Sequence, residues 1–289
     1  MHDFSVLVAV ALPSSGPKLL RVARLLAPSP QFRLTALHCR ADGDEFIADS
    51  NEDDPLGPLL LEAGNDDVNP VYLYMDDLDE SILAVARERE ANLILMGWHR
   101  PMVPDGEPDG PIRGVLERSE CDVGILLSRH FRPVRRVLAP FHGGRHDRRA
   151  LEFAARIART QDVVATVLHV VTPERPASSA GPSLSETVDS FSDGQIQLKV
   201  VESADPIEAA IREARTGYDM IVAGASEVWA TDFSPFPERL QQLAFATPAS
   251  LLVVHSSCPL VADEKVPWAA TGELGPSPRS YRHRRLNSR

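Results

Sequence analysis

Two glycine-bearing segments carry the side chains best suited to chemistry in this chain of 289 residues. The first segment begins at Gly97 and continues through Trp98, His99 and Arg100. His99 and Arg100, together with Arg113, could donate charge-assisted hydrogen bonds to an anionic ligand. Trp98 could line such a pocket, or it could equally cover the edge of a sheet. The segment is therefore a candidate site for an anion.

The second segment is the run Gly143-Gly144-Arg145-His146-Asp147. A glycine turn that leads into a helix leaves free backbone N–H groups, and these could hold an anion. A tight turn in which Asp147 is the cap or the first-turn acid is the alternative, and the residue types favour it.

Two histidines stand at equivalent strand ends, in the pairs Leu37-His38 and Leu168-His169. Backbone groups at these ends could contact a ligand. More often such a histidine packs against the neighbouring loop and forms its hydrogen bonds there.

Catalytic motifs are missing from the sequence. It contains no G-x-S-x-G elbow, no P-loop lysine motif and no H-E-x-x-H pattern. Ser226 follows closely after Gly224 but has no evident His or Asp partner. The acidic run at residues 42–54 does not match a calcium loop and is better interpreted as a solvated loop. We expect neither an enzyme nor a metal site.

The composition restricts the class of protein. The formal net charge of −11 argues against a nucleic-acid partner, which would require a basic face. The three cysteines have no metal-like spacing, and no secretory signal precedes the first expected strand. No apolar run approaches the roughly 20 residues of a membrane-spanning helix. We therefore expect a cytoplasmic protein.

Buried strands and amphipathic helices must position these segments. Apolar runs predict strands at residues 4–11, 33–40, 71–75, 93–96, 123–127 and 250–254. A helix with Asp79 as its cap is expected before residue 91, and a short helix at residues 112–118. In a parallel sheet, the loops that follow the strands gather at the carboxyl edge, where open α/β sheets bind ligands.

The pattern then repeats along the chain. Val6-Leu7 recurs as Val137-Leu138 and Leu37-His38 as Leu168-His169, both 131 positions later. Gly97 recurs as Gly224, and the strand at 123–127 as 250–254, both 127 positions later. Two offsets that each hold for two elements indicate a duplication.

The expected fold is two Rossmann-like α/β/α domains of three layers, at residues 1–130 and 134–257. Each would contain a five-stranded parallel sheet of order 3-2-1-4-5. Residues 125–127 and 252–254 would pair, forming a pseudo-dimer within one chain and removing two exposed edges. The sequence is also compatible with a homodimer of such chains. The Arg-rich tail, residues 258–289, is expected to be disordered.

A duplicated five-strand unit with Leu-His at the end of strand two resembles the universal stress protein family. TVLHVV at residues 166–171 is typical of that family, and TALHCR in the first copy is a weaker match. The resemblance implies a fold like that of the adenine nucleotide α-hydrolases. It also implies ATP or AMP as a ligand, bound where glycines let backbone N–H groups approach phosphates.

The sequence departs from the family's nucleotide pattern, Gly-x-x-Gly followed by Gly-Ser/Thr. Arg100 takes the second glycine position, and Pro111 follows Gly110. In the second copy Glu227 takes the second glycine position. The family's acidic residue at the end of strand one is also missing, since Ala9 and Pro140 lie there. We expect a degenerate nucleotide site.

A narrower resemblance concerns residues 91–160. The runs Gly97-Trp98-His99-Arg100, Val115-Leu116-Glu117-Arg118 and Val137-Leu138-Ala139-Pro140-Phe141-His142-Gly143-Gly144 resemble the cytosolic carboxy-terminal region of monovalent cation:proton antiporters. This resemblance implies a regulatory module whose partner is a transporter membrane domain or another protein. The alternative is a free-standing universal stress protein that binds ATP or AMP.

The candidate ligand-binding residues lie after strands one, two and four of each copy. They are Ala9, Leu12, His38, Gly97, Trp98, His99, Arg100, Gly110, Arg113, Gly114, Pro140, Gly143, Gly144, His146, His169, Gly224 and Ser226.

Overall fold

The structure is a computed structural model of the chain. It describes residues 4–26, 32–40, 54–64, 68–74, 77–98, 111–129, 132–160, 162–173, 184–186, 188–189, 195–225 and 238–257. Within these ranges no helix is both long and apolar enough to cross a membrane.

The part of the chain that carries the first five strands is called the first half below. Its elements are β1 (Ser5–Ala9), a 3-10 turn (Pro13–Ser15), α1 (Gly16–Leu26), β2 (Arg33–Arg40), α2 (Gly57–Ala63), β3 (Asn69–Tyr74), α3 (Leu78–Glu88), β4 (Leu93–Gly97), α4 (Pro111–Arg118) and β5 (Asp122–Leu127). Every strand that we predicted in this half is present, with ends that differ by at most two residues.

The part that carries the other five strands is called the second half. Its elements are β6 (Arg136–Pro140), α5 (Arg145–Ala158), β7 (Val164–Val171), β8 (Ile196–Glu202), α7 (Pro206–Ala214), β9 (Met220–Gly224), α8 (Glu238–Ala246) and β10 (Ser250–His255).

All ten strands belong to one sheet, in the order β3-β2-β1-β4-β5-β10-β9-β6-β7-β8. Neighbouring strands are parallel except β5 and β10, which pair antiparallel at the centre with Leu126 opposite Leu252. The predicted α/β class and the pairing of residues 125–127 with 252–254 are confirmed. The structure has a single ten-stranded sheet, because this pairing continues the hydrogen-bond ladder from one half into the other.

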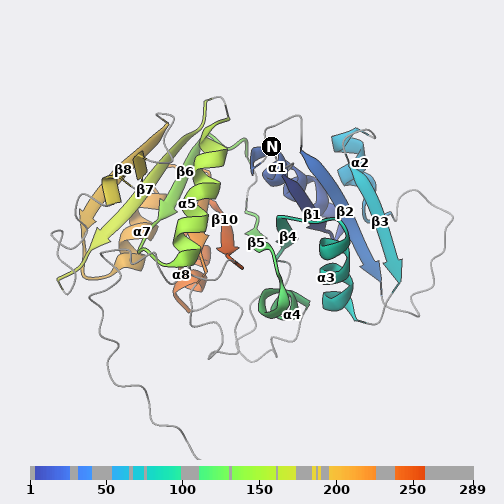
Figure 1. Ribbon diagram of the computed structural model, residues 1–289. Helices are drawn as coiled ribbons and strands as arrows, with labels where there is room; N and C mark the ends of the chain where they lie inside the picture. The colour runs from blue at the N-terminus through green and yellow to red at the C-terminus, as the bar shows by residue number, and fades with distance from the viewer. Residues whose placement is uncertain are drawn as a thin grey trace, which may run out of the picture.

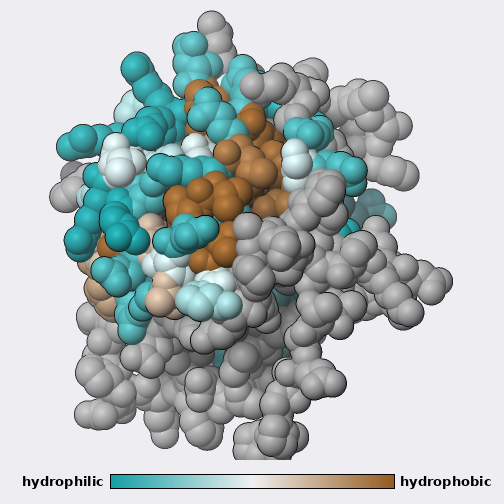
Figure 2. Space-filling model, turned by 90° about the vertical axis from the view of Figure 1, so that its left-hand side faces the viewer, coloured by the Kyte–Doolittle hydropathy of each residue, from teal (hydrophilic) through white to brown (hydrophobic). Residues whose placement is uncertain are grey.

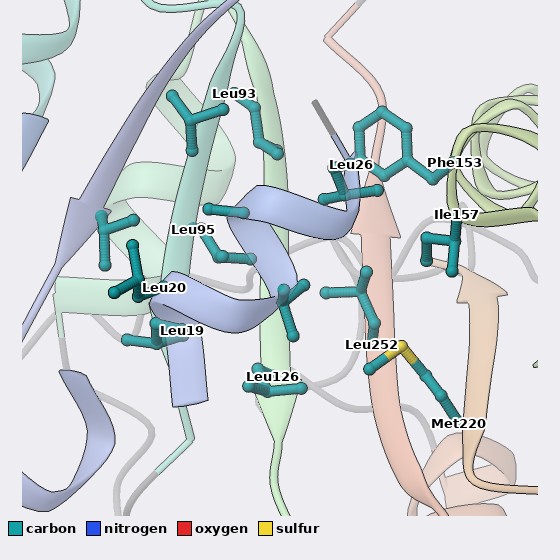
Figure 3. Packing of buried hydrophobic residues seen from close by; sticks show 14 of the residues in the cluster. Leu19, Leu20, Leu26, Leu93, Leu95, Leu126, Phe153, Ile157, Met220 and Leu252 are labelled. Atoms are coloured by element: carbon teal, nitrogen blue, oxygen red, sulfur yellow. The ribbon is translucent and has the colours of Figure 1, made fainter. Parts of the chain in front are cut away.

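Helices cover both faces of the sheet (Figure 1). Side chains from α1, α2 and α5 form one apolar cluster on one face, and side chains from α3, α4, α7 and α8 form a second cluster on the other. At the junction of the halves, Leu26 of α1 lies near Phe153 and Ile157 of α5 (Figure 3). A fully buried Leu or Phe side chain contributes about 1.5–3 kcal/mol, so this apolar contact helps to fix the two halves together.

The two outer edges of the sheet are β3 and β8. Leu198 and Val200 of β8 are exposed. The side of the molecule that faces the viewer in Figure 2 shows a hydrophobic patch. Tyr72 on β3 is held by hydrogen bonds from its hydroxyl to Asp54.

One helix cap differs from our prediction. The side chain of Asp77, rather than Asp79, caps α3 by accepting a hydrogen bond from the backbone N–H of Glu80 at 3.0 Å. Asp79 instead forms an ion pair with Arg118 of α4 at 2.7 Å. The first-turn acid was taken for the cap because both positions hold an aspartate, and only the packing of α4 on α3 separates their roles.

Candidate functional site

The candidate site in each half is the carboxyl end of its first, second and fourth strands, β1, β2 and β4 or β6, β7 and β9. His38 lies near the carboxyl end of β2, and its Nδ1 donates to the backbone oxygen of Val10 at 2.8 Å. His169 on β7 makes the same bond to the oxygen of Phe141 at 3.1 Å. Because a carbonyl oxygen only accepts, Nδ1 carries the proton in both rings. Both histidines therefore hold the loop after strand one, as the packing interpretation predicted.

The second nitrogen of His38 distinguishes the two histidines. His38 is 8% exposed, and its Nε2 is buried without a hydrogen-bond partner among the described residues. With the proton on Nδ1, this Nε2 is an acceptor. A buried acceptor without a partner is uncommon in native proteins, so this atom marks a place where a ligand group could donate.

Asp147 fills the glycine turn of the second half. Its Oδ2 accepts hydrogen bonds from the backbone N–H groups of His142 and Gly143 at 2.9 Å and of Gly144 at 3.2 Å. Desolvation raises the pKa of Asp147, and the hydrogen bonds from the three N–H groups oppose that shift. The turn that could hold an anion thus holds a carboxylate of its own chain. Gly144 is the N-cap of α5, and Asp147 is the first-turn acid whose side chain bonds back to it.

Gly224 has a steric role at the end of β9. A Cβ atom at this position would come within 2.4 Å of Asp147 Oδ1 and 2.5 Å of Asp147 N. A side chain is therefore excluded, because the first turn of α5 lies directly against the end of β9. Glycine is required here for close packing, and no phosphate need be invoked to explain it.

The first half has no carboxylate at the corresponding place. The offset of 131 residues that relates the two strand-one regions puts Gly16 where Asp147 lies. Ser15, in the preceding turn, donates from Oγ to the oxygen of Leu12 at 2.7 Å. A Cβ at Gly16 would approach Leu59 Cβ to 2.9 Å, because α2 packs on the start of α1. Leu12 is 47% exposed beside this turn.

His146 points into the interior. It is 2% exposed, and its Nδ1 accepts a hydrogen bond from the backbone N–H of Ser256 at 2.8 Å. Its ring lies 4.6 Å from that of His255, centroid to centroid. Burial, with His255 and Arg145 nearby, lowers the pKa of His146 to about 3, and burial with Arg145 lowers the pKa of His255 to about 4. This pair therefore links α5 to the end of β10. We placed His146 among the ligand-binding candidates because it follows the glycine turn, and we did not predict this structural contact.

The segment after β4 is only partly described. Gly97 is the last residue of β4, and Trp98 donates its backbone N–H to Leu126 O at 2.9 Å. The Trp98 side chain packs against the apolar cluster under α3 and α4, which agrees with a role in covering the sheet edge. His99, Arg100, Gly110 and Ser226 lie outside the described residues.

On α4 the candidate residues make contacts within the fold. Arg113 pairs with Glu117 at 2.8 Å on the helix surface. A Cβ at Gly114 would lie 1.5 Å from Asp79 Oδ2, so this glycine lets α4 approach α3. Ala9 and Pro140 are partly buried at the ends of β1 and β6 and offer no side-chain polar group.

Metal-ligand clusters and reactive thiols were two further possibilities among the described residues. No group of three or more His, Cys, Asp or Glu in the described ranges could hold a metal ion. Burial raises the pKa of the Cys39 thiol to about 11 and that of Cys121 above its usual range, so both thiols are protonated at neutral pH and poor nucleophiles.

Comparison with known proteins finds a similarity in the second half. Residues 133–262 match the model of the universal stress protein family. This region of the chain is therefore similar to that family. A universal stress protein from Archaeoglobus fulgidus has the same fold, with a TM-score of 0.55 at 14% identity over 87% of this chain and 96% of that chain. The cytoplasmic domain of a prokaryotic cation chloride cotransporter has a TM-score of 0.57 at 11% identity, over 89% of this chain and 96% of that chain.

Among curated sequences, the chain is similar to Cation/H(+) antiporter 15 of Arabidopsis thaliana. The two are 25% identical over 234 residues, which is 62% of this chain and 28% of the antiporter. The chain thus spans about a quarter of the length of that relative. The chain with its universal stress protein domain is related to cation/H+ antiporters, as the sequence resemblance indicated.

Proposed function

We propose that this chain is a regulatory module for a monovalent cation:proton antiporter, built from two universal stress protein domains at residues 1–130 and 134–257. Each domain would have the strand order 3-2-1-4-5, and residues 258–289 would lie outside both. The module would act at the cytoplasmic face of the membrane, with a transporter membrane domain as its partner and without catalysis. Its support is the universal stress protein domain at 133–262 and the similarity to plant antiporters.

The asymmetry between Asp147 and Gly16 carries the proposal for the ligand. A small nucleotide, ATP or AMP, would bind at the carboxyl edge of the first half only. In the second half the three N–H groups of the turn already bond to Asp147, so a phosphate would have to displace a carboxylate. In the first half a glycine stands at that position. His38 Nε2 would accept a hydrogen bond from a hydroxyl or amino group of the ligand.

Other residues of the first half would contribute to this site. His99, Arg100 and Arg113 would donate to the phosphates, and Gly97 and Gly110 would allow the backbone to approach them.

Regulation would follow from the continuous sheet. A ligand that favours one arrangement of the first half shifts the equilibrium toward that arrangement. The bias would reach the second half through the β5–β10 ladder and through the ion pair between Asp122 of β5 and Arg149 of α5, at 2.9 Å. The partner would sense the arrangement of the two halves.

Ligand binding is tested by calorimetry and thermal shift with ATP and AMP on the full chain. The informative variant is His38→Asn, because the Asn amide can keep the bond to Val10 O while Nε2 is lost. His169→Asn is the matched control, with the same bond to Phe141 O. We expect the nucleotide to raise the unfolding midpoint of the parent and of His169→Asn, and to have a much smaller effect on His38→Asn. No response from the parent chain would contradict the nucleotide proposal.

Native mass spectrometry of the purified protein gives a second test. A co-purifying adenine nucleotide would support the site in the first half. Cation:proton exchange in vesicles that contain a related antiporter membrane domain, with and without this module, tests the regulatory role. Equal transport rates in both preparations, at every nucleotide concentration, would overturn that role and favour a free-standing stress protein.

A further inference from the structure

A cavity of about 560 Å³ opens at the amino-terminal edge of the sheet in the first half, at the opposite end of the strands from the site above. It lies among the first residues of β1, β2 and β3 and the end of α3. Its lining includes Ser5, Phe32, Arg33, Glu88, Arg89 and Glu90.

The two halves have the same backbone hydrogen bonds around this place. The N–H of Ser5 donates to Asn92 Oδ1, and the N–H of Asn92 donates to Ser5 O, both at 2.8 Å. In the second half the N–H of Arg136 donates to Asp219 Oδ2, and the N–H of Asp219 donates to Arg136 O, both at 2.9 Å. Ser5 and Arg136 therefore occupy equivalent positions at the start of β1 and β6.

In the second half the side chain of Arg136 fills the corresponding space. Its Nη1 donates to the backbone oxygens of Thr216 at 3.0 Å and Gly217 at 3.2 Å, where α7 has just ended. Its guanidinium lies 4.4 Å from the centre of the Tyr218 ring. One guanidinium thus satisfies two carbonyl groups at a helix C-terminus and packs on an aromatic ring.

In the first half both of these large side chains are replaced by small ones. Ser5 replaces the arginine, and Ala91 replaces the tyrosine, 127 positions before Tyr218. Ser5 Oγ donates to Arg89 O at 3.2 Å, and Arg89 is the equivalent of Thr216. The contact with the first carbonyl is preserved, while the side chain that extends past it in the second half is missing and a cavity lies beside Ser5.

One end of the cavity attracts positive charge. The C-terminus of α3 presents backbone oxygens and the negative end of its dipole. Glu88 and Glu90 add two carboxylates. Glu90 has φ +49°, a left-handed conformation, at the position where the second half has Gly217 with φ +107°. A glutamate held where glycine is the relaxed choice indicates that its side chain has a use.

The lining also offers hydrogen-bond donors. The Nε of Arg89 is buried without a hydrogen-bond partner among the residues that the structure describes. Its Nη2 lies 3.6 Å from Glu88 Oε1. Arg33 is a second cation in the lining. A carboxylate is the acceptor that suits a guanidinium donor best.

We propose that this cavity binds a small zwitterion that carries a guanidinium or ammonium group and a carboxylate, the chemical class of a basic amino acid. The cationic group takes the place that Arg136 fills in the second half, against the backbone oxygens after α3 and the Glu90 carboxylate. The carboxylate accepts from Arg89 Nε. Phe32 supplies an aromatic wall of the cavity. The site is separate from the nucleotide site and does not depend on it.

The test is titration calorimetry of the full chain with L-arginine and with agmatine, which has the same guanidinium but no carboxylate. We expect arginine to bind and agmatine to bind about tenfold more weakly, because it leaves Arg89 Nε without an acceptor. Equal affinities would overturn the assignment of the carboxylate end. No heat with either compound would overturn the site.

Three variants locate the binding. Ser5→Arg places the guanidinium of the second half in the cavity, and we expect it to abolish arginine binding. If that variant does not fold, Glu90→Gly, which copies Gly217, removes one carboxylate without strain and should weaken arginine binding severalfold. Arg136→Ser is the matched control in the second half, and it should leave the affinity of the first-half cavity unchanged. Full arginine binding by Ser5→Arg or by Glu90→Gly, or its loss in Arg136→Ser, would contradict the proposal.

Discussion

The two halves of the molecule have the same backbone arrangement and differ in the side chains at equivalent positions. At the carboxyl edge, Asp147 occupies the glycine turn of the second half, and Gly16 stands at the same place in the first. At the amino edge, Arg136 covers the end of α7, and Ser5 leaves a cavity beside α3. In both places the second half satisfies its own backbone with a side chain. The first half is therefore where we propose that ligands bind, and the second half is where side chains of the chain itself occupy the equivalent places.

The largest expected effect comes from Asp147. Asp147→Ala leaves three backbone N–H groups without their acceptor and removes the first-turn carboxylate of α5, so we expect the free energy of unfolding to fall by about 3 kcal/mol. Urea denaturation measures it. Asp205→Ala is the matched control, since Asp205 is an exposed cap on α7, and should lose only about 1 kcal/mol. Equal losses would show that Asp147 is an ordinary cap rather than a substitute for a ligand.

The stability of the second half should depend on pH through the pair His146 and His255. The first half has no such pair, because Ser15 and Ser128 occupy the corresponding positions. The pKa of His146 is about 3 and that of His255 about 4 in the folded protein, below the usual 6.5. The unfolded chain therefore binds more protons, and stability that is complete above pH 6.5 is lost as the pH falls toward 4.

We expect about 2–3 kcal/mol less stability at pH 5 than at pH 7 from this pair. The double variant His146→Ser, His255→Ser copies the first half and should flatten the profile between these pH values. Denaturation curves at a series of pH values measure it. A profile that stays as steep in the double variant would place the titrating groups elsewhere.

The ion pair between the halves has no counterpart at the positions that the repeat relates to it. Asp122 and Arg149 lie 2.9 Å apart, whereas the offsets put Ala249 and Lys18 at the corresponding positions. Burial raises the pKa of Asp122, and Arg149 opposes that shift. Arg149→Met would leave the carboxylate without its partner and should reduce the free energy of unfolding by about 2 kcal/mol.

Adding Asp122→Asn should restore part of that loss, as a double-mutant cycle would measure. Lys199→Met, which breaks the exposed pair with Glu213, is the control and should change stability by less than about 1 kcal/mol. Strict additivity of the two substitutions at the junction would mean that this pair does not couple the halves.

The smallest expected effect is at the amino edge. Arg136→Ser removes the hydrogen bonds to Thr216 and Gly217 and the contact with the buried Tyr218 ring. The Arg136 side chain itself is exposed, so the variant should lower stability by only about 1 kcal/mol. Methylguanidinium at millimolar concentration should restore part of the midpoint in this variant, in a thermal shift assay. The same compound should not raise the midpoint of Ser5→Arg. Failure to rescue Arg136→Ser would weaken the view that this space accepts a free guanidinium.

Much of the fold could be predicted from the sequence. Runs such as residues 93–96 and 250–254 are apolar without interruption, which identifies strands buried on both faces. The constant offset between Leu37-His38 and Leu168-His169 predicted matching structures, and both histidines make the same bond. The Asp79 cap was wrong because propensity does not separate two aspartates two positions apart when only one contacts the next helix.

The sequence alone determined the strands, the repeat, the edge of the sheet where loops gather and the residue types available there. These depend on local periodicity and on glycine positions, which short-range physics governs. The tertiary structure alone decided which groups meet. It turned His146 inward to Ser256, brought Asp147 into the turn beside Gly224, and left the space beside Ser5 open. Such contacts depend on how closely helices and strands that are distant in the chain approach each other, and no pattern within one element carries that distance.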